Sequence, residues 1–173
     1  MIYYFTSDTH FGHVNIIKYC NRPFKNVEHM DKSLIRNWNA RVKKNDMVFH
    51  LGDFAYRNSL SQRNYMEGLN GQIILIRGNH DSNNNCKSII DSMFIHIGGH
   101  EFFLTHEPDW GAGGQYGGSL VICGHVHELW KFQHFDYPDF GIQYDAINVG
   151  VDVWNYRPIT INEILKEYEK WKK

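Results

Sequence analysis

The stretch "LIRGNHDSN", residues Leu75 to Asn83, joins a run of strand-forming residues to a cluster of polar ones. The aliphatic residues Ile73 to Ile76 lead directly into Arg-Gly-Asn-His-Asp. A turn explains this composition, because Gly and Asn tolerate positive φ and Asn and Asp side chains bond their own backbone. A ligand site also explains it, because ligands bind outside the carboxyl ends of strands in open α/β sheets. The other strands of the chain decide between the two interpretations.

Potential ligands follow five predicted strands in the same way. They are Asp8 and His10 after strand 2–6, Asp53 after strand 46–51, Asn79, His80 and Asp81 after strand 72–77, His106 after strand 101–105, and His125 and His127 after strand 120–123. Each of these alone is compatible with an ordinary turn or a solvated surface. Five independent turns would not be expected to carry metal-ligand types at one edge, so the set predicts a functional site there.

The pattern of apolar residues predicts an α/β protein with mixed sheets, organised as a single domain over residues 1–173. Helices are expected over 27–43 and 59–69, near 84–91, and from a capping box at Thr160–Glu163 to about Trp171. A hairpin with a glycine turn is expected over 93–105, and a further strand over 146–149. Alternating strands and helices at the start of the chain imply parallel strands joined by right-handed crossovers.

Composition narrows the class of protein. The chain has 173 residues, 42% of them hydrophobic, and a net charge of −1 without a basic stripe, which argues against tight non-specific nucleic-acid binding. Its three cysteines form no Cys-x-x-Cys pair, so neither a disulfide framework nor a thiolate zinc site is expected. No secretion signal or membrane-spanning run is evident. We therefore expect a cytoplasmic protein without a membrane partner, and a homo-oligomer stays open.

The donor set indicates a metal centre. Imidazole, carboxylate and amide donors without thiolate suit Mn²⁺, Fe or Zn²⁺ better than Ca²⁺. The seven candidates are Asp8, His10, Asp53, Asn79, His106, His125 and His127. Seven ligands are too many for one tetrahedral ion and suit two ions that share a carboxylate. Such pairs lie about 3.5–4 Å apart and stabilise the attacking and leaving oxygens of an in-line displacement at phosphorus.

The same residues resemble the motifs of the calcineurin-like metallophosphoesterase superfamily. The matching blocks are "DTH" at Asp8–His10, "GD" at Gly52–Asp53, "GNHD" at Gly78–Asp81, the lone His106 and "GHVH" at Gly124–His127. The segments "HFGHVNII" (10–17), "NRPF" (21–24) and "NVGVDVWNYRPI" (148–159) resemble its small bacterial and phage-type members, so the resemblance covers nearly the whole chain. It implies a four-layer α/β sandwich, with two mixed β-sheets flanked by helices.

The resemblance also implies roles for the site residues. Asp8, His10 and His127 would hold one divalent ion, Asn79, His106 and His125 would hold a second, and Asp53 would bridge them. Manganese is the preferred metal, with iron, zinc and nickel as alternatives. The ions would activate a shared water for attack on phosphorus. His80 would protonate the leaving oxygen or contact the phosphate, and Asp81 would orient His80.

Substrate contacts are less constrained by the sequence. His13, Arg22 and Arg57 lie near the motif blocks and could bind substrate, although surface or structural roles explain each of them as well. Specificity is expected in two loops, 107–118 and 132–145, of which the first reads equally as a connector or as a flap. The expected activity is hydrolysis of a small or nucleotide-like phosphodiester. The alternatives are a phosphomonoesterase or protein phosphatase, and a non-catalytic metal-binding scaffold.

Overall fold

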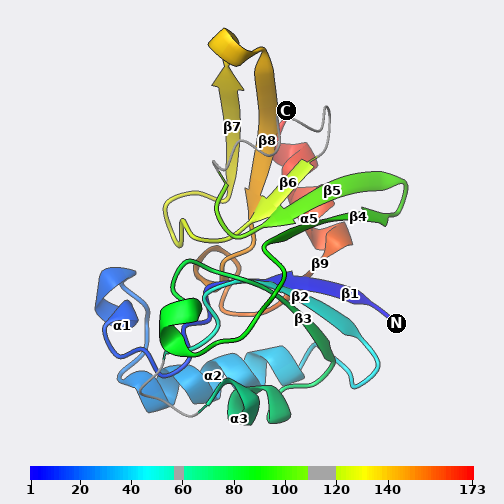
Figure 1. Cartoon of the computed structure of the whole chain (residues 1–173). Helices are drawn as coiled ribbons and strands as arrows, with labels where there is room; N and C mark the ends of the chain where they lie inside the picture. Colours follow the sequence, from blue (N-terminus) through cyan, green and yellow to red (C-terminus); the bar gives the residue numbers. More distant parts are fainter. Residues whose placement is uncertain (57–60, 109–119) are drawn as a thin grey trace.

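The computed structural model describes residues 1–56, 61–108 and 120–173, which form two β-sheets and their flanking helices (Figure 1). The first sheet has the order β3-β2-β1-β9. Strands β1 (Tyr3–Thr6), β2 (Met47–Leu51) and β3 (Gln72–Ile76) are parallel, and β9 (Ile159–Thr160) pairs antiparallel with β1. The carboxyl ends of the three parallel strands lie at one edge of the sheet, as expected for strands that are joined through helices.

The second sheet has the order β4-β5-β6-β8-β7. Its central strands β5 (His100–Thr105), β6 (Leu120–Cys123) and β8 (Ile142–Asn148) are parallel. The outer strands β4 (Ser92–Ile97) and β7 (Phe132–Tyr137) pair antiparallel with β5 and β8. The β4–β5 hairpin turns at Gly98 and Gly99, which both have positive φ, as the sequence predicts.

Four α-helices are described. They are α1 (Ile16–Tyr19), α2 (Val27–Asn39), α3 (Gln62–Glu67) and α5 (Ile161–Trp171), and three short 3₁₀ turns lie at Ser82–Asn84, Pro138–Phe140 and Val151–Val153. Asn26 and Ser61 cap the first turns of α2 and α3 with their side chains. The capping box of α5 forms between Thr160 and Glu163, as the sequence predicts. None of the helices in the described ranges is long and apolar enough to cross a membrane.

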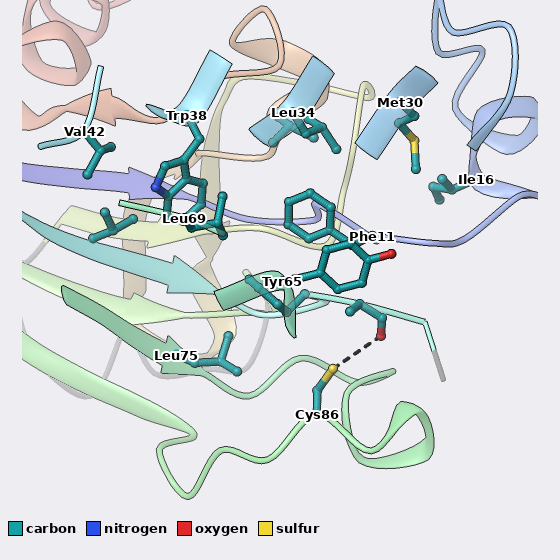
Figure 2. Packing of buried hydrophobic residues seen from close by; sticks show 14 of the residues in the cluster. Phe11, Ile16, Met30, Leu34, Trp38, Val42, Tyr65, Leu69, Leu75 and Cys86 are labelled. Atoms are coloured by element: carbon teal, nitrogen blue, oxygen red, sulfur yellow. Dashed lines mark hydrogen bonds between the residues drawn. The ribbon is translucent and has the colours of Figure 1, made fainter. Parts of the chain in front are cut away.

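Two hydrophobic clusters fix the layers. The first fills the space between α2, α3 and the first sheet, with Trp38, Phe11 and Tyr65 near its centre (Figure 2). The second lies between the two sheets and includes Phe5, Phe102 and residues of α5. Burying each large apolar side chain contributes about 1.5–3 kcal/mol. The expected architecture of two mixed β-sheets with flanking helices is therefore confirmed (Figure 1).

The prediction of a helix near residues 84–91 is wrong. Only a 3₁₀ turn forms there, and it ends at Asn85, whose φ is +58°. The chain then runs extended beside β3, because Ile90 forms a parallel bridge with Ile76 and its carbonyl accepts the N–H of Arg77. The polar side chains that favoured a helix instead bond to backbone, as Ser88 does to the carbonyl of Leu75.

The loop expected over residues 132–145 is also wrong, because this segment forms β7 and most of β8. The exposure of β7 alternates from His134 to Tyr137, which is typical of a strand with one covered face, and Gly141 turns the hairpin with a φ of +62°. The other predicted elements are present with shifted ends: α2 stops at Asn39, α3 begins at Gln62, and the strand expected over 146–149 is the end of β8. The helix α1 and the strands β7 and β9 were not predicted.

Candidate metal centre

The loops that follow the parallel strands meet at one edge, where the two sheets approach each other. The N–H of Asp8 donates to the carbonyl of Gly52 at 3.0 Å, and the N–H of His10 donates to the carbonyl of Asp53 at 3.0 Å. A parallel bridge between Ser7 and Gly150 joins the end of β1 to the segment after β8. The motif residues therefore stand on a frame of backbone hydrogen bonds that links both sheets.

Five of the predicted ligands have backbone conformations that non-glycine residues rarely adopt. The φ angles of Asp8, His10, Asp53, His125 and His127 lie between +47° and +71°. Residues held in the left-handed region cost of order 1 kcal/mol or more each and gather at functional sites. At these loops the strained backbone turns side chains from neighbouring strands toward one another.

Glycines of the motif blocks leave room for the ligand side chains. A Cβ on Gly124 would lie 2.6 Å from Oδ2 of Asp8 and closer still to Oγ of Ser7. A Cβ on Gly52, whose φ is +90°, would lie 2.6 Å from Nδ1 of His106. The glycines therefore belong to the site because a side chain at either position would displace a ligand.

The predicted ligands form two groups that share Asp8, and Asp53 lies close to a histidine of each group. One nitrogen of His10, one of His127 and one carboxylate oxygen of Asp8 all lie within 4.8 Å of one another, and so do ligand atoms of Asp8, Asp53 and His106. Oδ2 of Asp53 is 3.4 Å from Nε2 of His10 and 3.6 Å from Nε2 of His106. The carboxylate of Asp53 thus lies between the rings of His10 and His106.

The second group is oriented by hydrogen bonds. Nδ1 of His106 donates to the carbonyl of Leu51 at 2.7 Å, so the lone pair of the neutral ring is on Nε2. That nitrogen is 2.9 Å from Oδ1 of Asn79, which is 3.3 Å from Nδ1 of His125. An acceptor nitrogen that faces amide and carboxylate oxygens is stabilised by a cation placed among them.

A buried imidazole nitrogen of His10 and the buried carboxylate of Asp53 also favour a bound cation. Nε2 of His10 is buried and has no hydrogen-bond partner among the described residues. Burial, followed by the neighbouring His127, lowers the pKa of His10 well below its ordinary value, so the ring is neutral at pH 7. Burial also raises the pKa of Asp53 to about 6, and the nearby carboxylate of Asp8 adds to this effect. The donor set therefore suits divalent metal ions that need imidazole and carboxylate ligands.

His127 is held by a buried ion pair whose role the sequence did not reveal. Nδ1 of His127 lies 3.2 Å from Oδ2 of Asp152, whose carboxylate is paired with Arg22. Burial lowers the pKa of His127, but its hydrogen bonds to Asp152 and Cys20 outweigh burial and raise that pKa to about 11. The carboxylate of Asp152 therefore holds the ring of His127 in a fixed orientation.

The expected role of Asp81 is corrected by the contacts. Asp81 does not orient the ring of His80, because its carboxylate accepts the backbone N–H groups of Asp53, Phe54 and Gly78 at 2.7–2.9 Å. It is fully buried and fixes the loops after β2 and β3. The ring of His80 is exposed, while its backbone N–H donates to Oδ1 of Asp53 at 3.0 Å.

The contacts also distinguish among the candidate substrate-binding residues. Arg22 is buried, and its guanidinium donates to Asp152 and to the carbonyls of Asp8 and Thr9, so it has the structural role and not the phosphate-binding one. His13 lines the same cavity as His10 and His80. Arg57 and most of the segment 107–118 lie outside the described residues, so their expected roles stay predictions.

Signals for the missed residues were present in the sequence. Asp152 and Asn148 both belong to the segment "NVGVDVWN" that carries part of the resemblance. The side-chain amide of Asn148 donates to the carbonyls of His127 and Trp130 at 2.8 and 2.7 Å, and its Oδ1 accepts the N–H of Gly150. This segment therefore supports the loop that carries His127.

Comparisons with known proteins agree with this geometry. A model of the calcineurin-like phosphoesterase superfamily domain matches residues 1–150. An uncharacterised protein of Methanocaldococcus jannaschii is 43% identical over 172 residues, covering 98% of this chain and 92% of its own. The gene 66 protein of Mycobacterium phage L5 is 26% identical over 198 residues, covering 93% and 91%. The crystal structure of a protein of unknown function from Aquifex aeolicus superposes with a TM-score of 0.68 at 28% identity, covering 95% of this chain and 98% of that one.

Proposed function

Because the chain belongs to the calcineurin-like phosphoesterase superfamily, we propose that it is a divalent-metal-dependent phosphodiesterase that hydrolyses its substrate at a dinuclear centre. Members of this family bind divalent metal ions. The observation that carries the proposal is the position of Asp53, whose Oδ2 lies 3.4 Å from His10 and 3.6 Å from His106. A carboxylate between two imidazole groups suits a bridging ligand of a two-metal site.

We propose a division of the ligands between two ions that follows the resemblance to the family motifs. Asp8, His10 and His127 would hold one ion, Asn79, His106 and His125 the other, and Asp53 would be shared. When bound, two such ions supply charge neutralisation at the phosphate and an activated water for in-line attack. Manganese is the metal that we propose for the site, with iron, zinc and nickel as alternatives, because the donor types do not select among Mn²⁺, Fe and Zn²⁺.

The residues of the chain contribute positioning and proton transfer. The exposed ring of His80 lies beside His10, with the ring centroids 6.0 Å apart, and would donate a proton to the leaving oxygen. Asp81 holds the loops of Asp53 and Gly78 in register through three backbone N–H groups, which keeps His80 and the bridging carboxylate at a fixed separation. The half-buried His13 stands at the cavity wall, where it would contact a phosphate oxygen.

A diester is favoured over a monoester by the charge of the cavity. The cavity beside His10 and His80 has a volume of about 340 Å³, and neither Lys nor Arg is among the described residues that line it. Arg22 is paired with Asp152, and Arg77, which lines the neighbouring pocket with Asn79 and His106, is paired with Asp91. A diester carries one negative charge where a monoester carries nearly two, so it needs fewer cationic partners beyond the metal ions.

The test uses metal-stripped protein to which Mn²⁺, Zn²⁺, Ni²⁺ or Mg²⁺ is added in turn. We expect Mn²⁺-dependent release of nitrophenol from bis(p-nitrophenyl) phosphate, faster than from p-nitrophenyl phosphate. A clear preference for the monoester would support a phosphatase instead. Binding of two ions without turnover of either substrate would contradict the proposal and favour the scaffold alternative.

A further inference from the structure

One cavity beside the proposed metal centre has walls of two chemical kinds. Five histidines belong to its lining: His10, His13, His80, His125 and His127. The lining also includes Ile16 and Tyr19 of α1 together with Val126 and Leu129 of the segment after β6, and we call these four residues the apolar wall. The wall therefore adjoins the position that the scissile phosphate would occupy.

The wall exposes apolar side chains to an unusual degree. Tyr19 is 70% exposed and Leu129 is 76% exposed, and they come from segments more than a hundred residues apart. Single exposed hydrophobic residues are common on protein surfaces. Here, however, two of them line one cavity with the metal-ligand candidates, which is the arrangement typical of a ligand pocket with few polar groups.

The charges of the cavity restrict what the wall can bind. Glu128 is the one carboxylate among the lining residues outside the proposed metal ligands, and the described lining contains neither Lys nor Arg. A second phosphate or a carboxylate placed there would meet an acidic side chain without a cationic partner. An uncharged group is therefore favoured next to the scissile phosphate.

The aromatic rings at the cavity favour a flat group. His13 stacks on Tyr56, with the ring centroids 4.4 Å apart and an interplanar angle of 5°. Tyr19 meets the edge of His13 at 6.3 Å and 77°. The exposed ring of Tyr19 can bind another flat ring by stacking, which contributes about 1–3 kcal/mol per base in nucleic-acid complexes.

We propose that the apolar wall is the subsite for a flat, uncharged aromatic group carried by the phosphate ester, such as a nucleobase. This inference rests on the proposed function, because the phosphate must lie at the metal centre for the ring to reach the wall. The cavity volume of about 340 Å³ is within the range of small-molecule sites. The subsite thereby gives the centre its preference among phosphate esters.

The test compares two ribose phosphates, of which only one carries a nucleobase. Isothermal titration calorimetry on manganese-loaded protein gives the Kd of adenosine 5′-monophosphate and of ribose 5-phosphate. An assay for inorganic phosphate checks that neither compound is hydrolysed during the titration. We expect the nucleotide to bind at least about tenfold more tightly. In the double variant Tyr19→Ala and Leu129→Ala, we expect this difference to vanish while the Kd of ribose 5-phosphate stays unchanged.

The matched control is Phe140→Ala. Phe140 is 77% exposed and lies between β7 and β8, at the end of a hairpin that points away from α1 (Figure 1). This control should keep the tenfold difference. Equal affinities in the unaltered chain, or a difference that survives the double variant, would overturn the inference, and so would binding of neither phosphate. A tenfold difference without turnover of any diester would count against the proposed function and leave the subsite standing.

Discussion

The guanidinium of Arg22 donates to both carboxylate oxygens of Asp152, with Nε–Oδ1 at 2.8 Å and Nη2–Oδ2 at 2.9 Å. The pair joins segments 130 residues apart, and both side chains are almost completely buried. Oδ2 of Asp152 is also 3.2 Å from Nδ1 of His127. A buried, bidentate ion pair therefore holds the ring of a proposed metal ligand in place.

Replacing Asp152 by Asn should weaken metal binding without removing any proposed ligand. The amide retains the shape but loses the charge that orients His127, and changes of this kind typically reduce metal affinity by about 10- to 100-fold. Titration of metal-stripped protein with Mn²⁺ measures the effect. We expect the weakened site to be the one that contains His127.

The chain provides a matched control in Asp145→Asn. Asp145 also bonds a histidine, with Oδ1 2.7 Å from Nδ1 of His134, but it lies on β8 and contacts Lys172 at the end of α5. Manganese affinity should not change in this variant. Equal losses in the two variants would mean that Asp152 acts through general stability and not through His127.

Replacing Gly124 by Ala should impair both folding and metal binding. The new Cβ would lie 2.6 Å from Oδ2 of Asp8, so the carboxylate or the loop must move. Overpacking of this kind lowers the free energy of unfolding by about 1–3 kcal/mol. Urea denaturation and manganese titration would measure the two effects.

Gly68→Ala is the control for that experiment. Its Cβ would meet no atom closer than 3.4 Å, and φ at this C-cap is −84°. The free energy of unfolding should change by less than about 1 kcal/mol, with metal affinity unchanged. If Gly124→Ala were equally mild, the close packing around Asp8 would not be a constraint on the site.

Replacing His80 by Ala should slow hydrolysis and leave metal binding intact. The exposed ring is removed, whereas the backbone N–H that donates to Asp53 at 3.0 Å remains. General acid catalysis contributes about 10²- to 10⁴-fold, and it matters most for poor leaving groups. We therefore expect a steeper dependence of kcat on leaving-group pKa in a series of aryl phosphodiesters. Loss of the metal ions in this variant would show that the proposed role of His80 is wrong.

His50 should make the stability of the metal-free protein depend on pH. Its ring is fully buried, Nε2 lies 2.9 Å from Oγ1 of Thr9, and burial lowers the pKa of His50 to about 3. Below the ordinary pKa of about 6.5 the unfolded chain takes up a proton that the folded chain refuses, so stability falls as the pH falls. By pH 5 this histidine should reduce the free energy of unfolding by about 2 kcal/mol.

Urea denaturation at pH 7.5 and pH 5 would measure the contribution of His50. The difference between the two pH values should shrink by that amount in His50→Gln, and it should not change in His100→Gln at an exposed position. An unchanged pH dependence in His50→Gln would mean that the buried ring does not govern the acid sensitivity.

The sequence was informative about the site because strand ends are local features. A strand followed by Asp or His needs only the periodicity of apolar residues and a parallel sheet to place the side chain at the edge. Asp8, Asp53 and His106, which follow three different strands, accordingly lie together, with ligand atoms within 4.8 Å of one another. The left-handed backbone at Asp8 and Asp53 was not foreseeable, because it depends on loops that hold each other in place.

The sequence was less informative about side chains whose hydrogen-bond or ion-pair partners are far away along the chain. Asp81 was expected to serve its neighbour His80, yet its carboxylate bonds the N–H groups of another loop, at Asp53 and Phe54. Arg22 was left open between phosphate binding and structure, because its partner Asp152 is 130 residues away. The polar residues after Asn84 were assigned to a helix, but pairing of Ile90 with β3 prevailed over local propensity.

The central claim is a dinuclear centre bridged by Asp53, and electron paramagnetic resonance of manganese-loaded protein tests it most directly. Two ions that share a carboxylate should give two manganese ions per chain and an exchange-coupled spectrum. In Asp53→Asn we expect loss of the coupling, with at most one tightly bound ion. One ion per chain in the unaltered protein, or two ions without coupling, would contradict the account.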